Sequence, residues 1–186
     1  MVELGSAIAA VVGRARQDRG WSTQELADRS GVSRSMISKI EREEVQPTAV
    51  LLGRLSGALG LTLTDLLGQA ETQEQLVSRA EDQPVWVDPE TGYCRKAVSP
   101  AGAWTIQIVE VNLPPGAHVP YPADSYRFVD HQILVLDGTL TFVEGSTSHI
   151  LEVGDCLQLG APTNCAYRND GDTVTRYIVV LARRQH

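Results

Sequence analysis

The residues best suited to chemistry lie in the second half of the 186-residue chain, in and after the stretch "VDHQILVLDG". His131, Ile133 and Val135 alternate along this stretch, so they share one face of a strand, and the two aliphatic residues indicate that this face is buried. In "CAYRN", Cys165 and Tyr167 share a face in the same way. An imidazole can donate, accept, titrate near neutral pH or bind a metal, and a thiol is a soft ligand. These residue types predict a ligand pocket or a metal site inside a β domain.

The elements that must position these residues are short β-rich runs. From residue 84 onward, runs such as "WTIQIVEVNL", "TLTFVEG" and "TRYIVVLA" alternate with turn signals such as "NLPPG", "EVGD" and "RNDGD". This regular spacing is typical of a sandwich or barrel rather than of βαβ units. We therefore expect one all-β domain over residues 84–186. The preceding residues 69–83, "QAETQEQLVSRAEDQ", are polar and acidic, and we interpret them as a linker that is partly helical.

The first 68 residues have a different texture, that of several short helices. Leu4, Ile8, Val11 and Val12 recur at helical spacing. Serine, threonine and glycine then occur where helices begin and end, and Glu25 follows Ser22 at the spacing of a capping box. The predicted caps are Ser22, Gly31, Ser33 and Thr48. Residues 1–68 are therefore expected to form a small all-α domain.

The net charge of −7 is unevenly distributed. Residues 1–68 contain eight Lys/Arg and eight Asp/Glu, whereas residues 69–186 contain eight and fifteen. Only the first part can approach phosphate without strong repulsion, and residues 14–42 hold seven basic against four acidic side chains. Three cysteines without a CxxC pair favour a reduced cytoplasm over a disulfide framework or zinc ribbon. No signal peptide and no apolar run of roughly 18 residues is present, so we expect a cytoplasmic protein with no membrane partner.

The segment "WSTQELADRSGVSRSMISKIEREEVQPTAVLLGRLSGALGLTLTDLL" resembles the phage repressor-type (XRE, lambda-repressor-like) helix-turn-helix family, and the resemblance covers residues 4–68. It implies a sharp turn at Gly31 and a following helix that reads a DNA groove. It also implies a dimer on a two-fold double-stranded operator. Residues at the positions of Arg34, Ser35 and Lys39 reach base edges in this family, and those of Thr23 and Ser33 meet phosphates. The DNA contacts expected from the resemblance are Thr23, Gln24, Ser33, Arg34, Ser35, Ser38 and Lys39.

Residues 84–186 resemble a small cupin, on the segments "LPPGAHVPYP", "DHQILVLDGTLTF" and "LEVGDCLQLGAPTNCAYRND". The resemblance implies a small β barrel, the double-stranded β-helix or jelly roll. Metal-binding cupins have a His-x-His pair, a Glu seven residues before the turn glycine, and a His four residues before an Asn. Here the last two positions hold His131 and Cys165, and the His-x-His region reads "ADSYRF". We therefore expect no cofactor, and a divalent metal on His131 and Cys165 is the disfavoured alternative.

A metal-free ligand pocket is the preferred interpretation, with His131 as a hydrogen-bonding or titrating group, and the alternative is a core histidine. Tyrosines supply apolar area with a polar tip, and Arg127 is suited to a carboxylate or sulfonate. The expected effector-binding residues are Tyr121, Tyr126, Arg127, His131, Gln158, Cys165 and Tyr167. A likeness to regulators of sulfur utilisation suggests a sulfur-containing or amino-acid-like effector. Cys156 and Cys165 are interpreted as small hydrophobes in preference to a thiol switch.

Together these observations predict a transcriptional regulator, not an enzyme, that dimerises through its cupin domain and changes its operator affinity when a small effector binds. A metal-dependent cupin dioxygenase or isomerase carrying a DNA-binding domain is the main alternative. A cupin that serves only as a dimerisation platform is the third.

Overall fold

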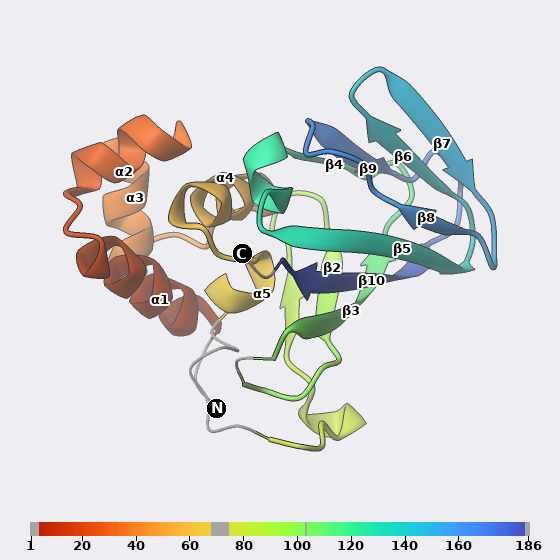
Figure 1. Ribbon diagram of the computed structural model, residues 1–186, viewed down its shortest axis with the longest axis horizontal. Helices are drawn as coiled ribbons and strands as arrows, with labels where there is room; N and C mark the ends of the chain where they lie inside the picture. Colours follow the sequence, from red (N-terminus) through yellow and green to blue (C-terminus); the bar gives the residue numbers. More distant parts are fainter. Residues whose placement is uncertain (1–3, 68–74, 103, 185–186) are drawn as a thin grey trace.

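A helical domain packs directly against a two-sheet β domain in the computed structural model, which describes residues 4–67, 75–102 and 104–184 (Figure 1). The helices are α1 (Leu4–Asp18), α2 (Thr23–Ser30), α3 (Arg34–Glu41), α4 (Ala49–Leu59) and α5 (Leu63–Leu66). Residue 68, at the expected domain boundary, and residues 69–74 of the expected linker lie outside the described residues. Within residues 75–83, a single 3-10 turn, η2 (Ala80–Asp82), is the helical part.

The helix caps lie where the sequence predicts them. The Ser22 hydroxyl accepts from the amide of Glu25 at 3.1 Å, and the Glu25 carboxylate accepts from the amide of Ser22 at 2.7 Å. Gly31 ends α2 with φ 67°, a left-handed conformation that favours glycine. Ser33 and Thr48 cap α3 and α4 through their hydroxyls. Local side-chain chemistry therefore sets the helix boundaries of this domain.

The β domain is a two-sheet jelly roll, as the cupin resemblance implies. One sheet has the order β1-β2-β3-β10-β5-β8 and the other β4-β9-β6-β7, and the described pairs are antiparallel. A short 3-10 helix, η3 (Ala123–Tyr126), leads from β4 into β5. The strands are β1 (Val85–Val87), β2 (Cys94–Ala97), β3 (Ile106–Leu113), β4 (His118–Tyr121), β5 (Val129–Asp137), β6 (Leu140–Glu144), β7 (Thr147–Leu151), β8 (Cys156–Gln158), β9 (Cys165–Arg168) and β10 (Thr175–Arg183).

Strand parity places the predicted residues inside the jelly roll. His131, Ile133 and Val135 are buried along β5, and Cys165 and Tyr167 are buried on β9 of the opposite sheet. The two sheets thus enclose an interior in which aromatic rings dominate. Tyr167 contacts Tyr121, Phe142 and Tyr177 at ring-centroid distances of 5.9, 5.0 and 5.5 Å.

Helix α4 lies between α1–α3 and the β domain (Figure 1). Hydrogen bonds to the β domain are found at its start and just after its end. At its start, the buried Asp88 carboxylate accepts from the amide of Ala49 at 2.9 Å. After its end, the buried Asp65 accepts from Arg183 at 2.6 Å and from Gln107 at 3.0 Å. The β domain therefore binds the first amide of α4 through Asp88. It also binds α5, the short helix that follows α4, through Gln107 and Arg183.

The middle of α4 approaches the β domain closely because two glycines share one helix face. A Cβ atom on Gly53 would lie 2.6 Å from the Tyr121 ring, and one on Gly57 would lie 2.9 Å from the Cβ of Asp124. The Ser125 hydroxyl of η3 donates to the carbonyl of Gly53 at 2.8 Å. Because these two glycines lack side chains, the backbone of α4 between Gly53 and Gly57 can approach η3 directly.

Gly57→Ala is expected to destabilise the protein by about 1–3 kcal/mol, because the new methyl group meets the backbone of η3 rather than a mobile side chain. The matched control is Gly13→Ala in α1, where the nearest atom would lie 3.9 Å away. That change should stabilise the protein by about 0.5–1 kcal/mol, since alanine is the better helix former. Urea unfolding measures both variants. A Gly57→Ala protein as stable as the Gly13→Ala protein would show that α4 does not pack this closely on η3.

Candidate functional sites: an exposed helix face and an interdomain cavity

The first candidate site is the outer face of α2 and α3. The residues expected there are placed together: Gln24, Ser33, Arg34, Ser35 and Lys39 are exposed, and Thr23 and Ser38 are partly exposed. Arg34 and Lys39 form no salt bridge with any residue that the structure describes, so both charges face solvent. Gln24 donates to Asp28 at 2.8 Å, and Ser33 is used in capping α3. The face thus offers two unpaired cations beside small hydroxyl side chains.

A salt bridge beneath this face fixes the orientation of α3. The Arg16 guanidinium on α1 donates to both carboxylate oxygens of Glu41, at 2.7 and 2.9 Å, and to the carbonyl of Trp21 at 2.7 Å. Both side chains are largely buried, and the hydrogen bond to Glu41 raises the pKa of Arg16. A bidentate pair of this kind constrains direction as well as distance. Helix α3 is therefore held rigidly against α1 while its outer face stays free.

The second candidate site is a cavity of about 30 Å³ at the junction of the two domains. Its walls come from both of them, so it is neither a simple barrel pocket nor a surface groove. Ser56, Thr62 and Leu63 contribute the helical side. The β domain contributes aromatic, charged and aliphatic side chains: Arg95, Tyr121, Ser125, Tyr126, Val129, His131, Tyr167, Val179 and Leu181.

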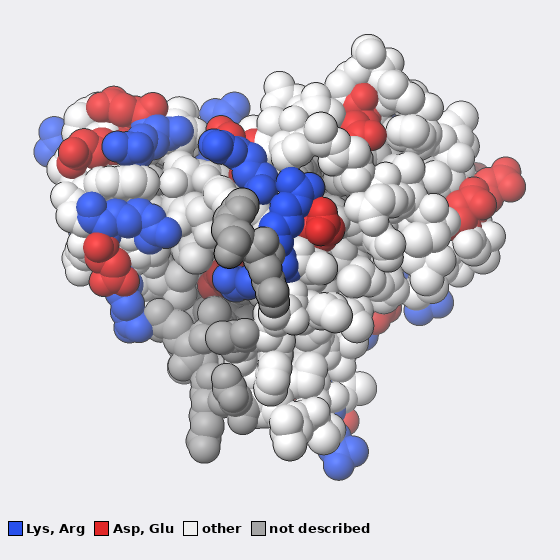
Figure 2. Space-filling view, viewed as in Figure 1, with Lys and Arg blue, Asp and Glu red and all other residues white. Residues whose placement is uncertain are grey.

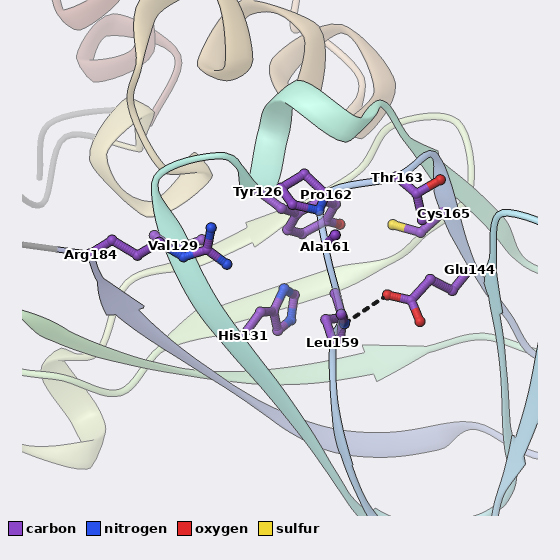
Figure 3. A pocket seen from close by; sticks show the side chains of 11 residues that line it. Tyr126, Val129, His131, Glu144, Leu159, Ala161, Pro162, Thr163, Cys165 and Arg184 are labelled. Carbon is purple, nitrogen blue, oxygen red and sulfur yellow. Dashed lines mark hydrogen bonds between the residues drawn. The ribbon is translucent and has the colours of Figure 1, made fainter. Parts of the chain in front are cut away.

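A smaller hollow of about 10 Å³ lies on the outer side of this cavity, beneath the loop after β8 (Figure 3). Its rim is formed by residues 159–163 with Glu144, Cys165 and Arg184, and the Glu144 carboxylate accepts from the amide of Gly160 at 3.0 Å. Tyr126, Val129 and His131 line both spaces. These three side chains are thus the partition between the hollow and the interdomain cavity.

His131 is a buried hydrogen-bonding group and does not titrate near neutral pH. Its Nε2 lies 3.1 Å from the Tyr167 hydroxyl, and its Nδ1 has no hydrogen-bond partner. Burial, together with the positive charge of Arg95, lowers the pKa of His131 to about 3. The histidine is neutral at physiological pH, so of the two expected roles only the hydrogen-bonding one is compatible with this environment.

Arg95 is the residue that the sequence analysis missed. It lies on β2 with 6% of its surface exposed, and its Nη1 donates to the Tyr93 hydroxyl at 2.9 Å. Burial opposes its charge, but the hydrogen bond to Tyr93 favours the charged form and a guanidinium does not lose its proton in proteins, so the pKa of Arg95 is raised. Its Nε has no partner, and it forms no salt bridge with any of the described residues. A permanent cation is therefore buried in the interdomain cavity.

Four of the seven expected effector residues line the interdomain cavity or its partition. These are Tyr121, Tyr126, His131 and Tyr167. Cys165 lines only the outer hollow. The other two line neither space. Arg127 lies on the surface, where it pairs with Asp124 at 3.3 Å, and Gln158 is exposed on β8, where its amide donates to the carbonyl of His131 at 3.2 Å. The cation of the cavity is Arg95, on a different strand.

The donor set does not fit a metal ion. Within residues 4–67, 75–102 and 104–184, no three His, Cys, Asp or Glu side chains come together as ligands. His131 and Cys165 alone are fewer than the three or four protein ligands of a zinc site. Burial also raises the pKa of the Cys165 thiol to about 11, so without a bound metal it is protonated rather than a reactive nucleophile. The alternative of a metal-dependent enzyme therefore lacks its ligands in the described part of the chain.

Comparison with known proteins agrees with this geometry at the exposed helix face. A profile of the helix-turn-helix family matches residues 12–66, the range that holds α2, the turn at Gly31 and α3. The chain carries a helix-turn-helix domain. Its exposed face is the face of α2 and α3 described above.

The likeness to individual proteins extends beyond this domain. The HTH-type transcriptional regulator SutR of Escherichia coli (strain K12) is 22% identical over 177 residues, 95% of both chains. SlrR of Bacillus subtilis (strain 168), also an HTH-type transcriptional regulator, is 35% identical over 69 residues, 37% of this chain and 45% of that protein. The crystal structure of an HTH_3 family transcriptional regulator from Vibrio cholerae has a TM-score of 0.78 at 22% identity and covers 98% of each chain. That structure shares the two-domain fold. In the described residues, no helix is long and apolar enough to span a membrane.

His131→Gln is expected to make the protein less sensitive to acid. The unfolded chain binds a proton at its histidine below pH 6.5, whereas folded His131 does so only near pH 3. Between these values the unfolded state holds one more proton, so wild-type stability falls by about 1.4 kcal/mol for each pH unit lowered from this residue alone. Urea unfolding at pH 7.5 and pH 5 measures the difference. His118→Gln, an exposed histidine on β4, is the control and should lose stability like the wild type. Equal losses in all three proteins would show that His131 titrates normally.

Proposed function

We propose that this protein is a DNA-binding transcriptional regulator in which the β domain binds a small molecule and thereby alters the affinity of the helix-turn-helix domain for its operator. The observation that carries the proposal is the interdomain cavity, whose walls belong to both domains. A molecule bound there contacts the helices and the jelly roll at once.

The exposed face of α2 and α3 supports the DNA-binding part. Arg34 stands in the first turn of α3 with its charge unpaired by any described residue, and an arginine so placed can make a bidentate contact to guanine worth about 1–3 kcal/mol of discrimination. Lys39 and the serine hydroxyls suit phosphates and bases nearby. Figure 2 shows both signs of charge over the helical domain and a run of Lys and Arg along its junction with the β domain. Because the excess of acidic residues lies after residue 68, DNA approaches from the helical side.

The proposal that an effector changes DNA affinity is supported by the contacts of α4 with both domains. Helix α4 contacts α2 on one side and β4 and η3 on the other, and η3 carries Tyr126 of the cavity partition. A ligand that stabilises one arrangement of η3 also favours one placement of α4 and of α2, which packs on α4 and on α3. Effector binding then shifts the population of DNA-competent molecules through this packed contact. Whether this raises or lowers operator affinity depends on which arrangement the ligand prefers.

A homodimer through the β domain is the proposed assembly. The outer face of the six-stranded sheet carries several exposed aliphatic side chains: Val85, Val87 and Ile106 are 46%, 46% and 53% exposed, and Ile108, Ile178 and Val180 on the same face are half-buried. The ion pairs of Glu110 with Lys96 and Arg176 lie among them, a mixture of apolar and charged side chains that is common at protein interfaces. A second copy stacked on this face would bury these side chains and present two helix-turn-helix domains to a two-fold operator.

Arg34→Ala is expected to relax discrimination at one operator position, and Thr23→Ala to weaken binding to all sequences alike. The DNA is a sequence that the wild-type protein selects from a random pool, and fluorescence anisotropy gives the affinities for it and for its single-base variants. Arg34→Ala should cost about 1–3 kcal/mol at the contacted base pair. Arg127→Ala, an exposed arginine of the β domain, is the control and should change nothing. A wild-type protein that selects no sequence, or an Arg34→Ala protein with unaltered preferences, contradicts the assignment.

Ile178→Glu is expected to convert the dimer to a monomer, because it removes an apolar side chain from the outer face and places a second carboxylate directly opposite Glu110. Sedimentation velocity measures the mass, and binding to the selected operator should weaken at the same time. Ile150→Glu is the matched control, since Ile150 is 70% exposed on β7 of the other sheet. If the Ile178→Glu protein stays dimeric while the Ile150→Glu protein dissociates, the interface lies on the four-stranded sheet instead.

A further inference from the structure

Arg95 is a buried cation without an anion. It is 6% exposed, makes one hydrogen bond to a neutral hydroxyl, and forms no salt bridge within the described parts of the chain. The surrounding tyrosines do not supply the charge, because burial raises the pKa of Tyr121 and Tyr167 well above the ordinary value and keeps them neutral. Burying a charge with no partner is costly. We therefore expect that an anion binds next to Arg95 in some state of the protein and offsets the free-energy cost of burying its charge.

We propose that the interdomain cavity is the binding site of a small organic oxyanion, a carboxylate or sulfonate, which Arg95 binds as its counter-ion. This inference rests on the proposed regulatory function and names the chemical class of its effector. The guanidinium fork matches the paired oxygens of such a head group, and the free Nε–H is one of the donors that an oxyanion would accept from.

The other walls of the cavity suit the same class of ligand. His131 brings a second polar atom without a partner, its Nδ1. If the Tyr167 hydroxyl donates to Nε2, the ring proton lies on Nδ1 and becomes a further donor. Val129, Val179 and Leu181 supply an apolar side for a short carbon chain. No aspartate or glutamate lines the cavity, so nothing in its described walls repels an anion.

The volume limits the size of the ligand. A cavity needs about 10–15 Å³ to hold one water molecule, and this one measures about 30 Å³. This is room for about two to three water-sized groups, so a small carboxylate or sulfonate such as acetate is near the upper limit, and a nucleotide does not fit. The outer hollow lies beyond Tyr126, so a rotation of this ring would join the two spaces and admit a ligand from the surface.

The position of the cavity gives the anion a regulatory role. Ser56 and Thr62 line it from the helical side, and Thr62 donates to Gln107 at 2.9 Å across the domain junction. An oxyanion on Arg95 would neutralise the buried charge at the point where α4 and α5 meet the jelly roll. Occupancy of one site thus changes the free energy of domain docking directly.

The test is thermal unfolding of the full chain in Tris buffer of constant chloride concentration, with acetate, propionate or methanesulfonate as the probe and acetamide or propionamide as the uncharged control. The anions should raise the melting temperature of the wild type with increasing concentration, and the amides should not. Arg95→Met should abolish this response. It should also melt a few degrees higher than the wild type without anion, because it removes an uncompensated buried charge. Arg127→Met, at the exposed arginine, should respond like the wild type.

Two further measurements make each outcome decisive. If Arg95→Met does not fold, Arg95→Lys keeps the charge but loses the fork, and its acetate affinity should fall by about tenfold or more; wild-type affinity in that variant overturns the proposal. Anions that stabilise the wild type and Arg95→Met equally also overturn it. Selection of operator DNA is measured separately. A protein that binds acetate through Arg95 but selects no DNA supports the anion site and refutes the regulator.

Discussion

Helix α4 is the element on which the rest of the structure depends, because both domains use it as part of their own core. Leu52, Leu55 and Leu59 are fully buried within it, while Gly53 and Gly57 lie against Tyr121 and η3. Asp88 and Asp65 fix its surroundings at the two ends. The helix-turn-helix domain is consequently positioned by direct packing on the jelly roll. Packed interfaces of this kind move between discrete arrangements rather than deforming continuously, so any change in the orientation of the domain requires α4 to repack.

Arg95 and His131 show how polarity is distributed in the enclosed interior. The charge of Arg95 helps keep His131 neutral, and the neutral tyrosines around both leave the guanidinium without a counter-charge. The protonation state of each of these groups depends on that of its neighbours. The unpaired charge lowers the stability of the folded protein but leaves a group that can bind an anion, and such local losses of stability are common at binding sites.

The sequence was sufficient where short-range chemistry decides the structure. Ser22, Gly31 and Ser33 are read from spacing alone, because caps and a left-handed turn depend on neighbours a few residues away. Alternation likewise placed His131 and Tyr167 inside the β domain. Arg95 was missed because arginine is seldom buried without a partner, although it shares its strand face with the buried Ala97. Arg127 was chosen for its charge alone, and its sequence neighbours do not indicate that it lies on the surface after η3. The glycine face of α4 likewise has a meaning only once η3 lies on it.

The place of β10 has a consequence for synthesis of the chain. This strand pairs with β3 on one side and β5 on the other, and its Arg183 holds Asp65 at the foot of the helical domain. On the ribosome the helices emerge first, and the strand that completes the six-stranded sheet emerges last among the described strands. The glycine face of α4 can meet η3 before this point, but β3 and β5 lack the strand that lies between them, and Asp65 lacks Arg183. Synthesis of residues 175–183 therefore completes the six-stranded sheet and its ion pair to the helical domain together.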